Sequence, residues 1–160
     1  TINIQIMAKE IERKFLVVSD DYKVLADSSE LISQAYLSVR PESTVRVRTA
    51  GDRAWLTVKG INHGAERDEW EYQVPVADAE AMIECCALTV PLQKTRWRVG
   101  RWEIDEYHGA LAPLTVAEIE LDSVDEEVDL PAFIGREVTG DPYYYNSSLA
   151  ASLGKVDPTD

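Results

Sequence analysis

The alternating charges of Glu10-Ile11-Glu12-Arg13-Lys14 constrain the fold of this chain more than any other feature. In a β-strand, alternate side chains point to the same face, so Glu10, Glu12 and Lys14 would form one row. Such a row can bind a divalent cation through its oxygens and a phosphate through its nitrogen, provided that the strand lines a wet cavity. In a helix, the same residues would instead give an exposed Glu10–Lys14 pair four positions apart.

The same alternation recurs along the chain, and this repetition favours the strand. The repeats lie in stretches rich in β-branched and aromatic residues, which are typical of strands. Most rows carry charges of a single sign. The basic rows are Arg46/Arg48, Lys59 (beside Thr57) and Lys94/Arg96/Arg98, and the acidic rows are Glu69/Glu71, Glu103/Asp105 and Glu118/Glu120.

In a half-exposed sheet, the charged face points to solvent and usually mixes both signs, so rows sorted by sign are unusual there. For any single strand, a solvent-exposed charged face stays open as an alternative. Like charges two positions apart repel one another unless something compensates them. The repulsion can be compensated by facing rows of opposite sign, by a bound metal or by a polyanionic ligand. A closed barrel would bring all three together. The sequence therefore predicts a barrel with a polar interior. A barrel held only by internal ion pairs is the alternative, but desolvated pairs add little net stability.

The order of these motifs resembles the CYTH superfamily, the triphosphate tunnel metalloenzymes. The series runs Glu-Ile-Glu-Arg-Lys, Arg-Val-Arg, Thr-Val-Lys, Glu-Trp-Glu, Lys-Thr-Arg and Glu-Ile-Glu, from about Met7 to Leu153. The resemblance implies an α+β fold, in which an eight-stranded antiparallel β-barrel with a few flanking helices forms a tunnel for a triphosphate and for Mg²⁺ or Mn²⁺. Known members include inorganic, thiamine and RNA 5′-triphosphatases and class IV adenylyl cyclases.

On this resemblance, carboxylates bind metal, because hard oxygen ligands suit Mg²⁺ and Mn²⁺. Glu10, Glu12 and Glu120 are expected to hold the principal ion, and Glu118 and Asp105 a second ion. The cations expected to hold the three phosphoryl groups are Lys14, Arg46, Arg48, Lys59, Lys94 and Arg96, with Arg98 as a weaker candidate. Lys14, Lys59 and Lys94 are the candidate catalytic lysines, and Lys59 or Lys94 would assist the leaving oxygen. Glu69 and Glu71 are expected to orient the cations or to bind metal through water.

Other common catalytic motifs are absent from the sequence. It contains no Gly-x-x-x-x-Gly-Lys-Ser/Thr loop, no His-Glu-x-x-His and no Cys-x-x-Cys, and no Ser or Cys has an evident His partner. His63 and His108 are expected at the surface. Carboxylates and cations suit hydrolysis of a phosphoanhydride, in which catalysis consists mainly of positioning phosphates and neutralising charge.

The favoured reaction is hydrolysis of inorganic tripolyphosphate to pyrophosphate and phosphate, because a compact domain leaves little surface to recognise an organic group. The first alternative is a class IV adenylyl cyclase that makes cyclic AMP from ATP. Thiamine triphosphate or nucleoside triphosphates are alternative substrates. A polyphosphate-binding module without activity is the third class, although binding alone would need mainly the cations.

Composition limits the partners and the location. With 160 residues and 45% hydrophobic content, the chain is expected to form a single domain over residues 1–160. Its net charge of −13 argues against binding to nucleic-acid duplexes or acidic membranes. Adjacent Cys85 and Cys86 suit a reducing cytoplasm. Met7 could be the native start, with residues 1–6 a leader or residues added upstream. Both a monomer and a homodimer remain open.

Local patterns predict the remaining elements. Residues 28–37 are expected to form a short helix or an irregular crossing. Asp78 is expected to cap a helix over residues 79–88, and residues 146–153 a small C-terminal helix. Gly51-Asp52 suits a hairpin turn, and residues 60–66 are expected to form a longer loop. The Tyr-rich segment 143–145 is expected to pack rather than to contact phosphate.

Overall fold

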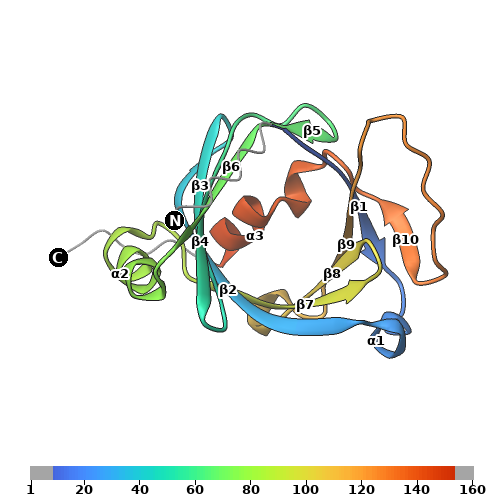
Figure 1. Cartoon of the computed structure of the whole chain (residues 1–160), viewed down its shortest axis with the longest axis horizontal. Coiled ribbons are helices and arrows are strands. Elements are labelled where there is room, and N and C mark those ends of the chain that lie inside the picture. The colour runs from blue at the N-terminus through green and yellow to red at the C-terminus, as the bar shows by residue number, and fades with distance from the viewer. Residues whose placement is uncertain (1–8, 154–160) are drawn as a thin grey trace.

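The computed structural model describes residues 9–153 as a nearly closed antiparallel barrel (Figure 1). The expected leader, residues 1–6, lies outside the described residues. The strands are β1 (Glu10–Val17), β2 (Ser28–Arg40), β3 (Ser43–Ala50), β4 (Arg53–Lys59), β5 (Glu66–Arg67), β6 (Glu69–Val74), β7 (Leu92–Val99), β8 (Trp102–Tyr107), β9 (Thr115–Glu120) and β10 (Ile134–Glu137). The helices are α1 (Tyr22–Leu25), α2 (Val76–Cys86) and α3 (Asn146–Ser152), with 3₁₀ turns η1 (Gly109–Leu111) and η2 (Pro142–Tyr144).

The short strand β5 closes the barrel. The sheet runs in the order β10-β1-β9-β8-β7-β2-β3-β4-β6, and β5 pairs with β1, placing Arg67 opposite Glu10. Only Asp68 separates β5 from β6. When β5 and β6 are counted as one interrupted strand, the ring from β1 to β6 has eight strands, which confirms the predicted antiparallel barrel. β10 pairs with the later residues of β1, outside this ring.

The predicted helix or irregular crossing at residues 28–37 is wrong, because this segment belongs to β2. β2 pairs with β7 through its first half and with β3 through its second half. Both of its faces carry apolar side chains, since Tyr36 packs inside the barrel and Leu37 packs under α2. A strand that is buried on two sides shows little alternation, so its local sequence did not indicate a strand.

Apolar side chains form three clusters, two on the outer face of the barrel and one inside it. One outer cluster contains Phe15, Trp102, Ile104 and Ile119 of the sheet, covered by residues such as Phe133. In a second outer cluster, α2 covers the faces of β3 and β4. The third cluster lies within the barrel, where α3 sits inside the ring of strands (Figure 1). The interior is therefore charged in one part and apolar where α3 packs.

Inside the barrel, Leu149 and Ala150 of α3 pack against strand side chains from β2, β7, β8 and β9, which are Tyr36, Leu92, Tyr107 and Val116. This position confirms the predicted C-terminal helix. By contrast, Asp78 lies in the first turn of α2 and is not its cap, because the helix begins after Pro75. Gly51 has a φ of 59° in the turn between β3 and β4, as predicted for that hairpin. Within residues 9–153, no helix combines the length and the hydropathy that crossing a membrane requires.

Candidate active site

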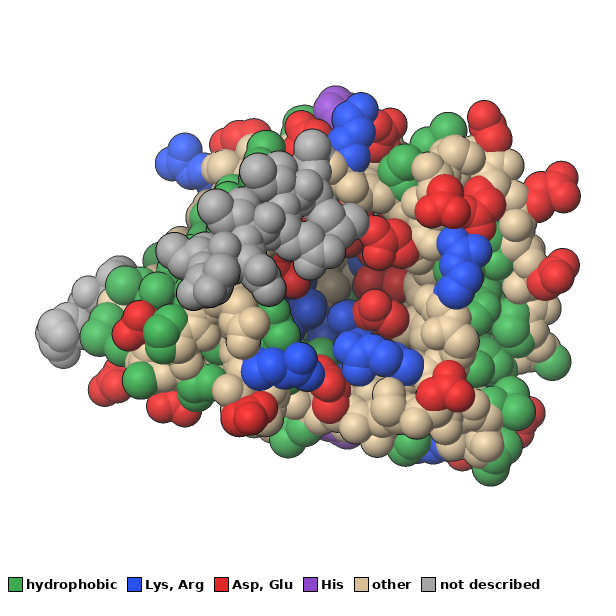
Figure 2. Space-filling model, viewed as in Figure 1, with side chains coloured by type: hydrophobic (Ala, Val, Ile, Leu, Met, Phe, Trp, Pro, Cys, Tyr) green, Lys and Arg blue, Asp and Glu red, His purple; other side chains and the backbone are tan. Residues whose placement is uncertain are grey.

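A charged cavity of about 230 Å³ lies inside the barrel. Figure 2 shows the hollow with acidic and basic side chains at its edge. Of the thirteen residues predicted for the site, eleven line this cavity: Glu10, Glu12, Lys14, Arg46, Arg48, Lys59, Glu69, Glu71, Arg96, Glu118 and Glu120. The other two, Lys94 and Asp105, do not. Strand alternation therefore brings most of the predicted set together.

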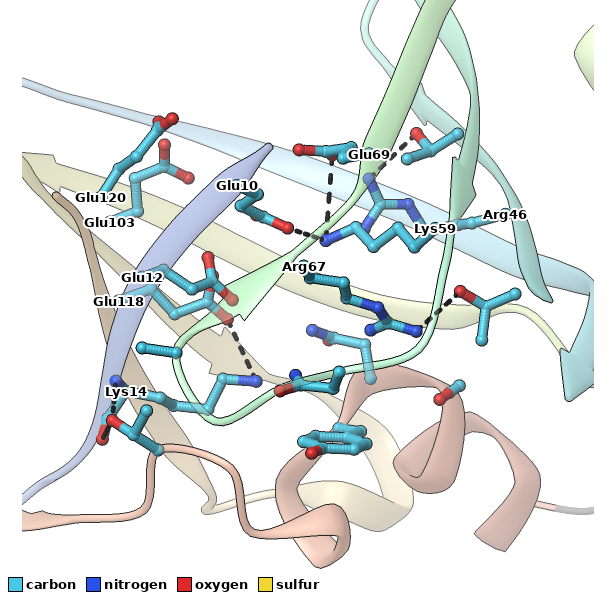
Figure 3. A pocket seen from close by; sticks show the side chains of 18 of the residues that line it. Glu10, Glu12, Lys14, Arg46, Lys59, Arg67, Glu69, Glu103, Glu118 and Glu120 are labelled. Carbon is cyan, nitrogen blue, oxygen red and sulfur yellow. Dashed lines mark hydrogen bonds and ion pairs between the residues drawn. The ribbon is translucent and has the colours of Figure 1, made fainter. Parts of the chain in front are cut away.

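The acidic side chains gather where β1, β9 and β8 adjoin. Strand register places Glu12 opposite Glu120, and Glu118 opposite both Lys14 and Glu103. In Figure 3, Glu12 lies beside Glu118, and Glu103 lies beside Glu120. Burial raises the pKa of Glu12 well above its ordinary value, and the neighbouring Glu118 and Glu10 carboxylates raise it further. Burial alone would also raise the pKa of Glu10 and of Glu118, but nearby cations, chiefly Lys59 for Glu10 and Lys14 for Glu118, lower the pKa of Glu10 and bring that of Glu118 to about 2. Glu12 is therefore the carboxylate whose negative charge the neighbouring cations compensate least.

A divalent cation fits the chemistry of this cluster. Its donors are carboxylate oxygens, which Mg²⁺ and Mn²⁺ prefer. The repulsion among Glu10, Glu12 and Glu118 is the kind that a bound cation relieves. In the part of the chain that the structure describes, no three His, Cys, Asp or Glu side chains are already arranged to hold an ion. The fit thus rests on the donor set and on the poorly compensated charge of Glu12.

Several cations of the cavity are paired with these and other carboxylates. Lys59 Nζ lies 2.7 Å from Glu10 Oε2 and 3.8 Å from Glu69 Oε1, between the two as Figure 3 shows. Burial lowers the pKa of Lys59, but Glu10, Glu12 and Glu69 outweigh burial and raise it, so this lysine stays charged. Lys14 Nζ lies 3.5 Å from Glu118 Oε1. These lysines are held in place inside the barrel.

Arg46 and Arg48 lie on the same face of β3 but have different partners. Arg46 donates to Thr57 Oγ1 at 3.1 Å and to Glu71 Oε2 at 3.4 Å. Arg48 donates from Nε to Gln34 Oε1 at 3.2 Å and has no carboxylate within 4.0 Å among residues 9–153. Burial, then the neighbouring Arg46 and Arg96, lower the pKa of Arg48 to about 10. Arg48 is therefore a half-buried cation without a carboxylate partner among the described residues.

Arg67 is a cavity-lining cation that the sequence prediction missed. Its Nε donates to the Gly60 carbonyl at 2.7 Å and its Nη2 to Thr44 Oγ1 at 3.1 Å. Among the described residues it forms no ion pair with a carboxylate. The sequence did carry an indication, because Arg67 shares the alternating positions of Glu69 and Glu71. The break at Asp68 ends β5, however, and places Arg67 in a different strand from those two glutamates. Glu103, which faces the cavity and pairs with Arg96, was named in an acidic row but not chosen for the site.

Lys94 and Asp105 form a buried ion pair outside the cavity lining. Both side chains are at most 1% exposed, and Lys94 Nζ lies 2.6 Å from Asp105 Oδ2. Arg96 donates to both oxygens of Asp105, at 2.8 and 2.9 Å. Burial lowers the pKa of Lys94 to about 7 against the pull of Asp105. Burial alone would raise the pKa of Asp105, but Arg96 and Lys94 hold it well below its ordinary value.

This placement differs from the one that the predicted roles require. A metal ligand needs a free lone pair facing the cavity, whereas both oxygens of Asp105 accept from cations. Lys94 faces inward but lies behind the lining, where α3 covers it through Asn146. The structure thus places Lys94 and Asp105 behind the cavity lining, where Asp105 still pairs with the lining residue Arg96.

The segment before and at the start of α3 also reaches the cavity. Thr139, Gly140, Tyr145, Asn146 and Ser147 contribute to its lining. The Tyr144 carbonyl accepts from Lys14 Nζ at 3.2 Å. This C-terminal contribution was not predicted, because the segment carries no charged row.

The fold and the site together define a β-barrel whose interior is built to hold a small polyanion beside a cluster of carboxylates. The chain belongs to the CYTH domain family, whose family model matches residues 8–148. This confirms the family resemblance of the sequence.

Relatives of the chain extend this comparison. An inorganic triphosphatase of Acetivibrio thermocellus is 42% identical over 147 residues, which cover 89% of this chain and 94% of the relative. An inorganic triphosphatase of Nitrosomonas europaea is 34% identical over 154 residues, covering 90% and 98%. The solved structure of the inorganic triphosphatase NE1496 is similar with a TM-score of 0.59 and 31% identity, covering 88% of this chain and 97% of that one.

Proposed function

We propose that this protein is a divalent-metal-dependent hydrolase that cleaves inorganic tripolyphosphate to pyrophosphate and phosphate inside its barrel. The observation that carries the proposal is the sorted lining of one cavity. An acidic cluster lies beside several cations, and Arg48 and Arg67 have no carboxylate within 4.0 Å among the described residues. Two half-buried cations without a carboxylate partner among the described residues favour an anionic ligand. Two relatives that match most of the chain are inorganic triphosphatases.

The cations would divide the binding of the three phosphoryl groups. Arginine guanidinium groups make forked contacts to phosphate oxygens, whereas lysine ammonium groups act as compact charges. The cavity-lining cations available for these contacts are Lys14, Arg46, Arg48, Lys59, Arg67 and Arg96. Lys94 would act from behind the lining. Glu69 and Glu71 would orient Lys59 and Arg46, with which they pair.

The metal proposed for the acidic cluster is Mg²⁺ or Mn²⁺. Glu10, Glu12, Glu118 and Glu120 would hold it, and Glu103, which lies opposite Glu118, would contribute to a second ion. A bound divalent cation supplies charge neutralisation at phosphoryl oxygens and lowers the pKa of water. We assign Asp105 to positioning Lys94 and Arg96 and leave it out of the metal ligands.

The reaction makes one bond to the terminal phosphorus and breaks another. A water oxygen bonds to this phosphorus in line, the bond from phosphorus to the bridging oxygen breaks, and pyrophosphate leaves with the bonding electrons. A water proton is released, and the leaving oxygen gains negative charge. Lys59 and Lys14, both charged and lining the cavity, would stabilise that oxygen, and Lys59 could donate a proton to it.

The setting of this enzyme is proposed to be the cytoplasm. Cys85 and Cys86 are exposed free thiols, which suit a reducing compartment. Its substrate would be a small triphosphate, with no nucleic-acid duplex and no membrane as partner. A monomer and a homodimer are both compatible with the proposed activity.

Phosphate release from tripolyphosphate, measured with and without Mg²⁺ or Mn²⁺ beside ATP and pyrophosphate, tests the proposal. Metal-dependent cleavage of tripolyphosphate is expected, and Arg48→Ala should lower kcat/KM by about 100-fold. Arg40→Ala removes an exposed arginine outside the cavity and is the matched control. Cyclic AMP formed from ATP, without tripolyphosphate cleavage, would identify a cyclase instead. Preferred cleavage of thiamine triphosphate or a nucleoside triphosphate would change the substrate, and binding without any turnover would indicate a polyphosphate-binding module.

A further inference from the structure

Asn146, the first residue of α3, connects the buried Lys94 to the cavity. Its Oδ1 accepts a hydrogen bond from the Tyr107 hydroxyl at 2.5 Å and from Lys94 Nζ at 3.2 Å. Asn146 also lines the charged cavity, whereas Lys94 and Tyr107 do not. Its side-chain amide therefore lies between the buried cation and the space proposed for substrate.

The two hydrogen bonds fix which end of the amide faces the cavity. While Lys94 carries its proton, its ammonium can only donate, so the oxygen of Asn146 faces Lys94 and the NH₂ group faces away. The NH₂ group donates to no described residue, and it is not among the buried polar atoms that lack a partner. Its two donors are consequently open to the cavity.

We propose that Asn146 is a substrate-binding residue, which donates from Nδ2 to a phosphoryl oxygen while its Oδ1 positions Lys94. This inference rests on the proposed function, because it concerns the same cavity. In its charged form, Lys94 polarises the amide and strengthens its NH₂ donors, as hydrogen bonds in a chain do. Lys94 thus acts on the substrate through Asn146 without touching it. A neutral donor also adds a contact without adding another charge to a crowded cavity.

Two substitutions at Asn146 separate a substrate contact from a structural role. Asn146→Asp keeps an acceptor for Tyr107 and Lys94 but replaces the donors with a negative oxygen. Asn146→Ala removes both functions. Loss of a hydrogen bond to a charged group should raise the KM for tripolyphosphate about tenfold in Asn146→Ala. Asn146→Asp should raise KM at least as much, with a melting temperature close to that of the wild type.

Ser148→Ala is the matched control, because Ser148 is exposed on the same helix. It should leave KM within about twofold of the wild type. If Asn146 only holds α3 and Lys94, Asn146→Asp should bind tripolyphosphate like the wild type. That result would overturn the inference, as would a lower melting temperature with unchanged KM in both variants.

Titration calorimetry with tripolyphosphate in EDTA separates this inference from the proposed activity. If the wild type binds tripolyphosphate in EDTA but does not hydrolyse it when Mg²⁺ or Mn²⁺ is supplied, the hydrolase proposal fails. Weaker binding by both Asn146 variants in EDTA would still support the substrate contact. Equal binding by the wild type and both variants would refute it. If the wild type neither binds nor cleaves tripolyphosphate, both proposals are refuted.

Discussion

Replacing Asp105 with Asn should destabilise the protein severely. The side chain is 1% exposed and accepts from Lys94 at 2.6 Å and from Arg96 at 2.8 and 2.9 Å. An amide of the same shape retains one acceptor oxygen but removes the negative charge from between two buried cations. Breaking a buried pair in this way costs about 3–5 kcal/mol of unfolding free energy. For a domain of this size, the melting temperature should fall by about 10 °C.

Thermal unfolding in EDTA, followed by circular dichroism, measures this loss without any contribution from metal. Lys94→Met in the Asp105→Asn background removes one of the two stranded cations. It should therefore recover part of the stability, with a coupling of about 1 kcal/mol or more between the two sites.

The opposite outcome would restore the role that the sequence suggested for Asp105. If Asp105→Asn melts within about 2 °C of the wild type and no longer gains stability from Mg²⁺ or Mn²⁺, Asp105 is a metal ligand and the buried-pair reasoning is wrong.

Three further substitutions test other parts of the barrel. Burial and nearby carboxylates raise the pKa of Glu12 in the folded state above 4.5, so the folded protein holds this proton more tightly than the unfolded chain does. The free energy of unfolding of the metal-free wild type should therefore fall as pH rises from about 4.5, and that of Glu12→Gln should fall less. Urea midpoints from pH 4.5 to 7 in EDTA measure the difference, and parallel curves would contradict it. Arg67→Ala should raise the KM for tripolyphosphate about tenfold; an unchanged KM with a lower melting temperature would show that Arg67 only ties Gly60 to Thr44. Gly51→Ala, at a φ of 59° in a hairpin turn, should cost about 1 kcal/mol in urea unfolding, and no change would mean that the turn relaxes.

The barrel was predictable wherever one face of a strand is charged. Alternation at Glu10/Glu12, Arg46/Arg48 and Glu118/Glu120 survives because carboxylates and guanidinium groups cannot occupy the apolar outer face. β2 escaped prediction because both of its faces pack against apolar neighbours. β5 is two residues long, so it carries too little pattern to reveal that it closes the ring.

The sequence predicted that the site residues face the inside of the barrel, but not which of them reach the cavity. A period of two tells which face of the sheet a side chain occupies, and Lys94 and Asp105 do face inward. It does not tell how far along the barrel each residue lies or what covers it. α3, about fifty residues from Lys94 in sequence, covers that part of the interior, and only the folded chain brings Asn146 to it.

The ion pairs inside the cavity affect how the affinity for a triphosphate depends on ionic strength. Lys59 and Lys14 are neutralised by Glu10 and Glu118 of the same chain, and not by ions from solution. A phosphate that reaches these lysines exchanges one anionic partner for another and displaces few dissolved counterions. Affinity should therefore fall with ionic strength less steeply than it does for a polyanion on an open basic groove, where counterion release sets the slope. For these two lysines, carboxylates of the barrel take the place of dissolved counterions.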